Sequence, residues 1–195
     1  MKKQYIWILL IFFLFVGPGP TVFFLNNYTV ALFPPASLIA VLWLLKDELA
    51  AADFNRLLKQ RSTYQWAFEA LKYSIFAHAA TTLMFRPQPN LTETLLGSYL
   101  VMPFYVVAVG PVLEEIAYRK IIFGALARRF NFWTGALVSS AIFTLGHFSW
   151  DRALGYFAVG LIFCHVYRRC GSIVPTMMAH SALNLISLIV GTLRG

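Results

Sequence analysis

Residues 101–120 read VMPFYVVAVGPVLEEIAYRK, an apolar run that leads directly into two adjacent glutamates. A membrane-spanning helix needs about 20 mostly apolar residues, and this stretch has that length. Ionisable side chains inside such a segment are costly and usually functional. The stretch therefore predicts a membrane-spanning helix that carries part of a buried polar site.

The composition of the whole chain agrees with a membrane protein. Of its 195 residues, 59% are hydrophobic and 12% are charged, whereas an average soluble domain is about 25% charged. So little polar surface cannot cover a water-soluble globule, and lipid must cover the rest. We expect an all-α polytopic membrane protein, a single membrane domain over residues 1–195 with about seven spans (six to eight).

The apolar segments place the spans along the chain. We predict spans at 5–25, 28–45, 64–85, 97–118 with a continuation to about 130, 132–149, 153–167 and 172–192. Residues 47–60 differ, because Leu49, Phe54, Leu57 and Leu58 recur among charges at helical spacing. That pattern is typical of an amphipathic helix on the membrane surface.

Basic residues alternate between the two sides of these spans. One set is Lys2, Lys3, Lys46, Arg56, Lys59, Arg61, Arg119, Lys120, Arg128, Arg129, Arg168 and Arg169, and the other is Arg86, Arg152 and Arg194. The positive-inside rule then places the amino terminus in the cytoplasm. The net charge of +8 fits contact with an anionic bilayer, and no basic surface with interleaved aromatics is available for nucleic acid.

Two adjacent carboxylates stand at the end of the apolar run. Glu115 and Arg119 are four residues apart, so they share a helix face and can form an ion pair. Glu114 is rotated by about 100° from Glu115 and faces elsewhere. The pattern predicts that Glu114 is a catalytic carboxylate and that Glu115 is a structural one.

Two further pairs lie on later spans, and each is four residues apart. The Phe143 ring can pack beside the imidazole of His147. His180 and Asn184 can point two neutral hydrogen-bond donors at one spot, which a developing oxyanion requires. These residues are the further candidates for the polar site.

The depth of these residues in the bundle is also predictable. Glu114 and His147 lie about equally far before and after the expected turn at Asn131, and at about 1.5 Å per residue both stand roughly 23 Å from it. Asn184 lies roughly 20 Å beyond Gly171 by the same rise. All the candidates can therefore meet in one layer.

Gly110 and Pro111 precede the glutamates and leave two alternatives for this helix. Proline removes a helical hydrogen bond and is at home in a first turn. The helix either restarts there, with Glu114 in the first turn of a new segment beside a wet cavity, or it has an ordinary proline kink.

The three motifs together resemble those of a known family. The pattern Glu114-Glu115-xxx-Arg119, then Phe143-xxx-His147, then His180-xxx-Asn184 is similar to that of the CPBP family. This family comprises the CAAX-processing proteases and the bacteriocin-processing or self-immunity (Abi) proteins. The motifs cover residues 114–184, and residues 97–192 form the matching catalytic core.

The resemblance implies a glutamic intramembrane endopeptidase in a prokaryotic cell membrane. Glu114 would activate water with help from His147, and His180 with Asn184 would form the oxyanion hole. Glu115 and Arg119 would support the site, and no cofactor would be needed. The substrate would be a membrane-embedded or lipid-anchored protein or peptide. No residue signal is specific for an isoprenoid, so CAAX processing in the strict sense is not implied.

Other functions fit parts of the same pattern. Glu114, His147 and His180 are acceptable ligands for zinc, as in a metalloprotease with water in the fourth position. Buried Glu and His residues also serve proton-coupled transporters, although transporters usually show repeated halves and this sequence shows none. A non-catalytic immunity or scaffold protein that keeps the motifs is the third alternative.

Overall fold

The computed structural model describes residues 2–194. The backbone of Arg194 is described but its side chain is not. The position of this basic residue, which was counted for the orientation of the chain, therefore lies outside the description. Within the described range the chain is helical and contains no strand, which confirms the all-α class.

The helical elements follow one another with short connections. They are α1 (Lys3–Phe15), η1 (Pro20–Phe24), α2 (Asn27–Leu44), α3 (Lys46–Ala50), α4 (Phe54–Lys59), α5 (Arg61–Phe85), α6 (Leu91–Ser98), α7 (Met102–Phe104), η2 (Tyr105–Val109), α8 (Gly110–Glu114), η3 (Glu115–Phe123), α9 (Gly124–Arg129), α10 (Phe132–Leu145), η4 (Trp150–Arg152), α11 (Ala153–Cys170) and α12 (Val174–Arg194). The elements from α7 to α9 form one continuous helix, because the backbone stays right-handed helical at each junction. We call it the central helix.

The long helices correspond to the predicted spans. Among the described residues, three are long and apolar enough to cross a membrane by themselves, namely Lys3–Phe24, Asn27–Leu44 and Val174–Leu193. The others are shorter or carry more charge, and α10 is a shorter apolar helix. The predicted surface helix at 47–60 is two short helices, α3 and α4. Asp53 separates them, because its side chain accepts the N–H of Arg56 at 2.9 Å and caps α4.

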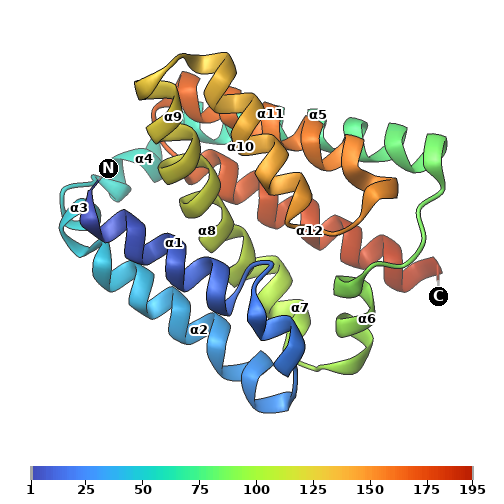
Figure 1. The fold of residues 1–195 in the computed structure, drawn as a ribbon. Helices are drawn as coiled ribbons and strands as arrows, with labels where there is room; N and C mark the ends of the chain where they lie inside the picture. The colour runs from blue at the N-terminus through green and yellow to red at the C-terminus, as the bar shows by residue number, and fades with distance from the viewer. Residues whose placement is uncertain (1, 195) are drawn as a thin grey trace.

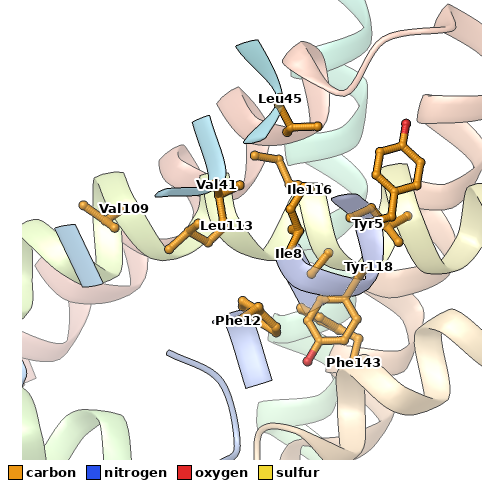
Figure 2. Packing of buried hydrophobic residues seen from close by; sticks show 12 residues of the cluster. Tyr5, Ile8, Phe12, Val41, Leu45, Val109, Leu113, Ile116, Tyr118 and Phe143 are labelled. Carbon is orange, nitrogen blue, oxygen red and sulfur yellow. The ribbon is translucent and has the colours of Figure 1, made fainter. Parts of the chain in front are cut away.

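The central helix runs between two groups of helices (Figure 1). The α1–α2 hairpin packs on one side of it, and α5, α10, α11 and α12 pack with one another on the other side. Ile8, Phe12 and Val41 of the hairpin meet Leu113 and Ile116 of the central helix in one buried cluster (Figure 2). The residues near Glu114 are thereby shielded from lipid on the hairpin side.

A cluster of charges closes one end of the bundle. Glu48 of α3 accepts from Lys2 and from Lys120 of the central helix, both at 2.7 Å. Partial burial alone would raise the pKa of Glu48, but hydrogen bonds from Lys120, Lys2 and Tyr5 lower it to about 2. The amino terminus, α3 and the central helix thus meet at this end.

Arg119 was counted among the loop charges, and the structure corrects this assignment. Its side chain is completely buried in the central helix and lies 3.4 Å from the carboxylate of Glu115. A charge that is neutralised inside the bundle says nothing about orientation, so only the other basic residues bear on it.

Candidate active site

The central helix passes through Gly110 and Pro111 without a break. Gly110 bonds through its N–H to the carbonyl of Tyr105, five residues earlier, so this turn is a π-turn. The wider turn accommodates a proline ring that would clash with the carbonyl of an α-turn. The helix therefore does not restart here, and Glu114 does not lie in a first turn.

The π-turn leaves the carbonyl of Val106 without its usual backbone donor. The N–H of Gly110 is bonded to Tyr105, and Pro111 has no N–H to offer. Asn184 of α12 fills the gap, because its amide Nδ2 donates to the Val106 oxygen at 2.9 Å. One hydrogen of this amide is thus used to hold α12 on the central helix, and the other remains free.

Glu115 is the centre of a buried charged group. Its Oε1 accepts a hydrogen bond from Nδ1 of His180 at 3.0 Å and lies 3.4 Å from Nη1 of Arg119. The guanidinium of Arg119 lies over the Phe143 ring at 4.4 Å and over the Phe163 ring at 5.2 Å. Aromatic faces attract a cation, so Arg119 is held by one carboxylate and two rings.

Glu114 is the less constrained carboxylate of the two. Its side chain is 20% exposed, and its Oε2 lies 3.8 Å from Nε2 of His180. Among the described residues this oxygen has no hydrogen-bond partner. His180 therefore stands between both glutamates, with Nδ1 toward Glu115 and Nε2 toward Glu114, and Glu114 is left free to bind another molecule.

The imidazole of His147 is held by the last turn of α10. Its Nδ1 lies 2.7 Å from the carbonyl oxygen of Phe143. A carbonyl only accepts, so Nδ1 must carry the hydrogen and Nε2 presents its lone pair in the neutral ring. The Phe143 ring packs against His147 at 4.5 Å and against His180 at 6.0 Å. Both histidines thus meet on one aromatic ring, although no hydrogen bond or ion pair joins His147 to Glu114 within residues 2–194.

The residues of the zinc alternative do not form a ready metal site. In the part of the chain that the structure describes, no three His, Cys, Asp or Glu side chains are placed to hold one metal ion. The bonds that Nδ1 of each histidine makes to protein would leave Nε2 available to a metal, so the placement of the side chains is the feature that argues against a site. Glu114, His147 and His180 are thus not arranged as a three-ligand centre.

One contact of this site was missed by the sequence analysis. The ring of Tyr156 in α11 stacks on His147, with centroids 4.0 Å apart and planes 29° apart. Tyr156 is one of nine tyrosines in an aromatic-rich chain, and no spacing singles it out. His78 packs edge-on against Tyr156 at 5.5 Å, in keeping with a packing histidine.

The comparisons with known proteins concern the same helices. Residues 96–186 match the model of the family described as type II CAAX prenyl endopeptidase Rce1-like. This segment contains all three motifs and most of the predicted catalytic core. The resemblance indicated by the motifs is thereby confirmed for residues 96–186, which match this family's model.

Curated relatives match over shorter stretches. The chain is 37% identical over 102 residues to the protein named membrane peptidase YdiL of Bacillus subtilis (strain 168), which covers 51% of this chain and 42% of that protein. It is 39% identical over 70 residues to the membrane-embedded CAAX protease MroQ of Staphylococcus aureus (strain USA300), covering 33% and 28%. It is 34% identical over 77 residues to the UPF0177 protein YxdF of Lactococcus lactis subsp. lactis (strain IL1403), covering 38% and 41%. The chain thus spans less than half the length of these relatives, and no solved structure matches it.

Proposed function

We propose that the chain is an intramembrane endopeptidase of a bacterial cell membrane, with its amino terminus in the cytoplasm. It hydrolyses a peptide bond in a membrane-embedded or lipid-anchored protein or peptide. The observation that carries this proposal is the carboxylate of Glu114, whose Oε2 has no hydrogen-bond partner among the described residues and lies 3.8 Å from Nε2 of His180. This carboxylate lies on the central helix, which is surrounded by apolar helices. The family and the relatives' names support the same reaction class.

The reaction begins with a water molecule at Glu114. The carboxylate takes a proton from the water, and the hydroxide that forms attacks the carbonyl carbon of the substrate. Nε2 of His147 is available as an acceptor for the same water. The proton then passes from Glu114 to the leaving amine when the peptide bond breaks.

The oxyanion of the tetrahedral intermediate needs donors in a dry site. His180 is held by Glu115 through Nδ1 and directs Nε2 toward Glu114, so Nε2 is the atom that would face the oxyanion. The second hydrogen of the Asn184 amide is the other donor.

Removal of metal should not abolish this activity. We expect purified enzyme in lipid nanodiscs to cleave a membrane-inserted reporter peptide equally well with and without a strong chelator, since Glu114 supplies the base. The measurement is the initial rate after chelation and after addition of zinc. Activity that chelation abolishes and zinc restores would overturn the glutamate mechanism and leave the peptidase proposal standing. Failure of the wild type to cleave any membrane-inserted peptide would contradict the proposed function itself.

Asn184→Ala should affect activity and stability by separate routes. Loss of one oxyanion donor costs about 2.7–4 kcal/mol of transition-state stabilisation. The variant also leaves the half-buried carbonyl of Val106 without a side-chain donor, which costs about 1 kcal/mol of folding free energy. Measurements of kcat/KM and of thermal unfolding in the same lipid separate the two effects.

Pro111→Ala provides the matched control in the Asn184→Ala background. Alanine at position 111 brings a backbone N–H that can bond the Val106 carbonyl across the π-turn. We expect the double variant to regain stability and to remain as inactive as Asn184→Ala. Recovery of activity along with stability would show that Asn184 acts only by holding the helices together.

A further inference from the structure

Tyr156 is an aromatic residue of α11 that lies flat on one face of the His147 ring. The two ring centroids are 4.0 Å apart and the planes differ by 29°. This is closer than any other contact between aromatic rings in the described residues. Since Tyr156 lies outside the three motifs, nothing in them assigns it a part in the site.

The His147 ring has one remaining rotation, which the contact with Tyr156 restricts. The hydrogen bond from Nδ1 to the Phe143 carbonyl fixes one ring atom, but the ring can still pivot about that bond. The Phe143 ring meets it at 4.5 Å with planes 62° apart, an edge contact that leaves the broad face open. Tyr156 covers that face and thereby fixes the direction in which Nε2 points.

Tyr156 is itself held from three elements. The side-chain amide of Asn90 donates to its hydroxyl at 3.3 Å, and His78 of α5 packs edge-on against its ring at 5.5 Å. Asn90 is the N-cap of α6, where it forms a capping box with Glu93. Glu93 in turn accepts from Arg152 at 2.8 Å, one turn before Tyr156. The stack is therefore braced by α5, by the N-cap of α6 and, through Glu93, by Arg152 of η4.

We propose that Tyr156 is a positioning residue for His147, which acts by holding the imidazole in the plane that aims Nε2 at the reacting water. The proposal rests on the proposed function, in which His147 assists Glu114. The ring does the positioning, and the hydroxyl only ties the ring to Asn90. The aromatic face is thus the required feature of this side chain.

The kinetic test compares Tyr156→Leu with Tyr156→Phe. Leucine removes the flat face, and a misplacement of a catalytic group by about 1 Å can cost about 10²-fold in rate. We therefore expect Tyr156→Leu to lower kcat by about that factor with KM unchanged. Tyr156→Phe keeps the stack and should remain near the wild-type kcat. Tyr167→Leu is the matched control, because Tyr167 lies on the same helix and packs on Phe123 instead of a histidine.

A spectroscopic test does not depend on peptidase activity. The chain has four histidines, so ¹⁵N labelling of histidine gives a spectrum simple enough to assign, with the His147 signals identified by their loss in His147→Gln. Tyr156→Leu should broaden or shift the two His147 ring nitrogens, whereas Tyr156→Phe and Tyr167→Leu should not. This result would support the positioning role even if the wild type proved to be no peptidase.

Two outcomes would overturn the proposal. Unchanged His147 signals and unchanged kcat in Tyr156→Leu would show that the ring does not need this contact. A loss in Tyr156→Phe as large as that in Tyr156→Leu would show that the hydroxyl, and not the aromatic face, is the required group.

Discussion

Glu114→Gln should lower the rate of peptide cleavage by at least about 10²–10⁴-fold, the contribution of a positioned general base. The amide has the shape of the carboxylate but cannot take a proton from water. Since Oε2 of Glu114 has no hydrogen-bond partner among the described residues, the substitution breaks no existing bond and the fold should survive. The measurements are the cleavage rate in proteoliposomes and the midpoint of thermal unfolding.

Glu69→Gln is the matched control for this change. Glu69 lies on α5, is 41% exposed and pairs with Lys72 three residues later. An exposed pair of this kind contributes little to stability, so cleavage by Glu69→Gln should equal that of the wild type. Near-normal cleavage by Glu114→Gln would mean that another group is the base.

Glu115→Gln should destabilise the fold by about 3–5 kcal/mol, because it leaves a buried charge without its counter-charge. Arg119 is completely buried, and the carboxylate of Glu115 is the anionic group in contact with it. The hydrogen bond that Oε1 accepts from His180 is weakened by the same change. The measurement is the free energy of unfolding in detergent micelles, followed by the helical signal.

Removal of both charges separates the ion pair from the shape of the site. In Glu115→Gln combined with Arg119→Met, an apolar side chain of similar length lies among Phe143 and Phe163, and no unpaired charge remains. We expect much of the lost stability to return, while activity stays low because His180 lacks its charged partner. Equal stability of Glu115→Gln and the wild type would show that the aromatic rings alone hold Arg119.

The sequence predicted those features that depend on length and on spacing within one helix. Apolar runs about 20 residues long gave the spans, and the four-residue spacing of Glu115 and Arg119 gave their contact, which the structure contains. The estimated depth of the candidate residues in the bundle also predicted that the central helix and α12 bring them together. In the structure His180 contacts both glutamates.

Features that depend on hydrogen-bond register or on contacts between helices were not predictable. Hydropathy does not distinguish an α-turn from a π-turn, so neither the unbroken helix at Pro111 nor the partner of Asn184 could be foreseen. The break between α3 and α4 depends on a single cap at Asp53. The stack of Tyr156 on His147 joins two helices through ring faces, for which the sequence carries no periodic signal.

The charged interior of the central helix has a consequence for how the protein is made. A charged residue at the centre of a spanning helix costs about 2.5–3.5 kcal/mol during insertion, and this helix carries Glu114, Glu115 and Arg119. Helix α1 together with η1, and helix α2, are long and apolar enough to cross a membrane by length and composition, and they precede the central helix in the chain. Once in the bilayer, they offer Ile8, Phe12 and Val41 as the surface on which the central helix docks. We therefore expect the hairpin, which lies outside residues 96–186, to assist insertion of the central helix by offering it an apolar surface already in the bilayer.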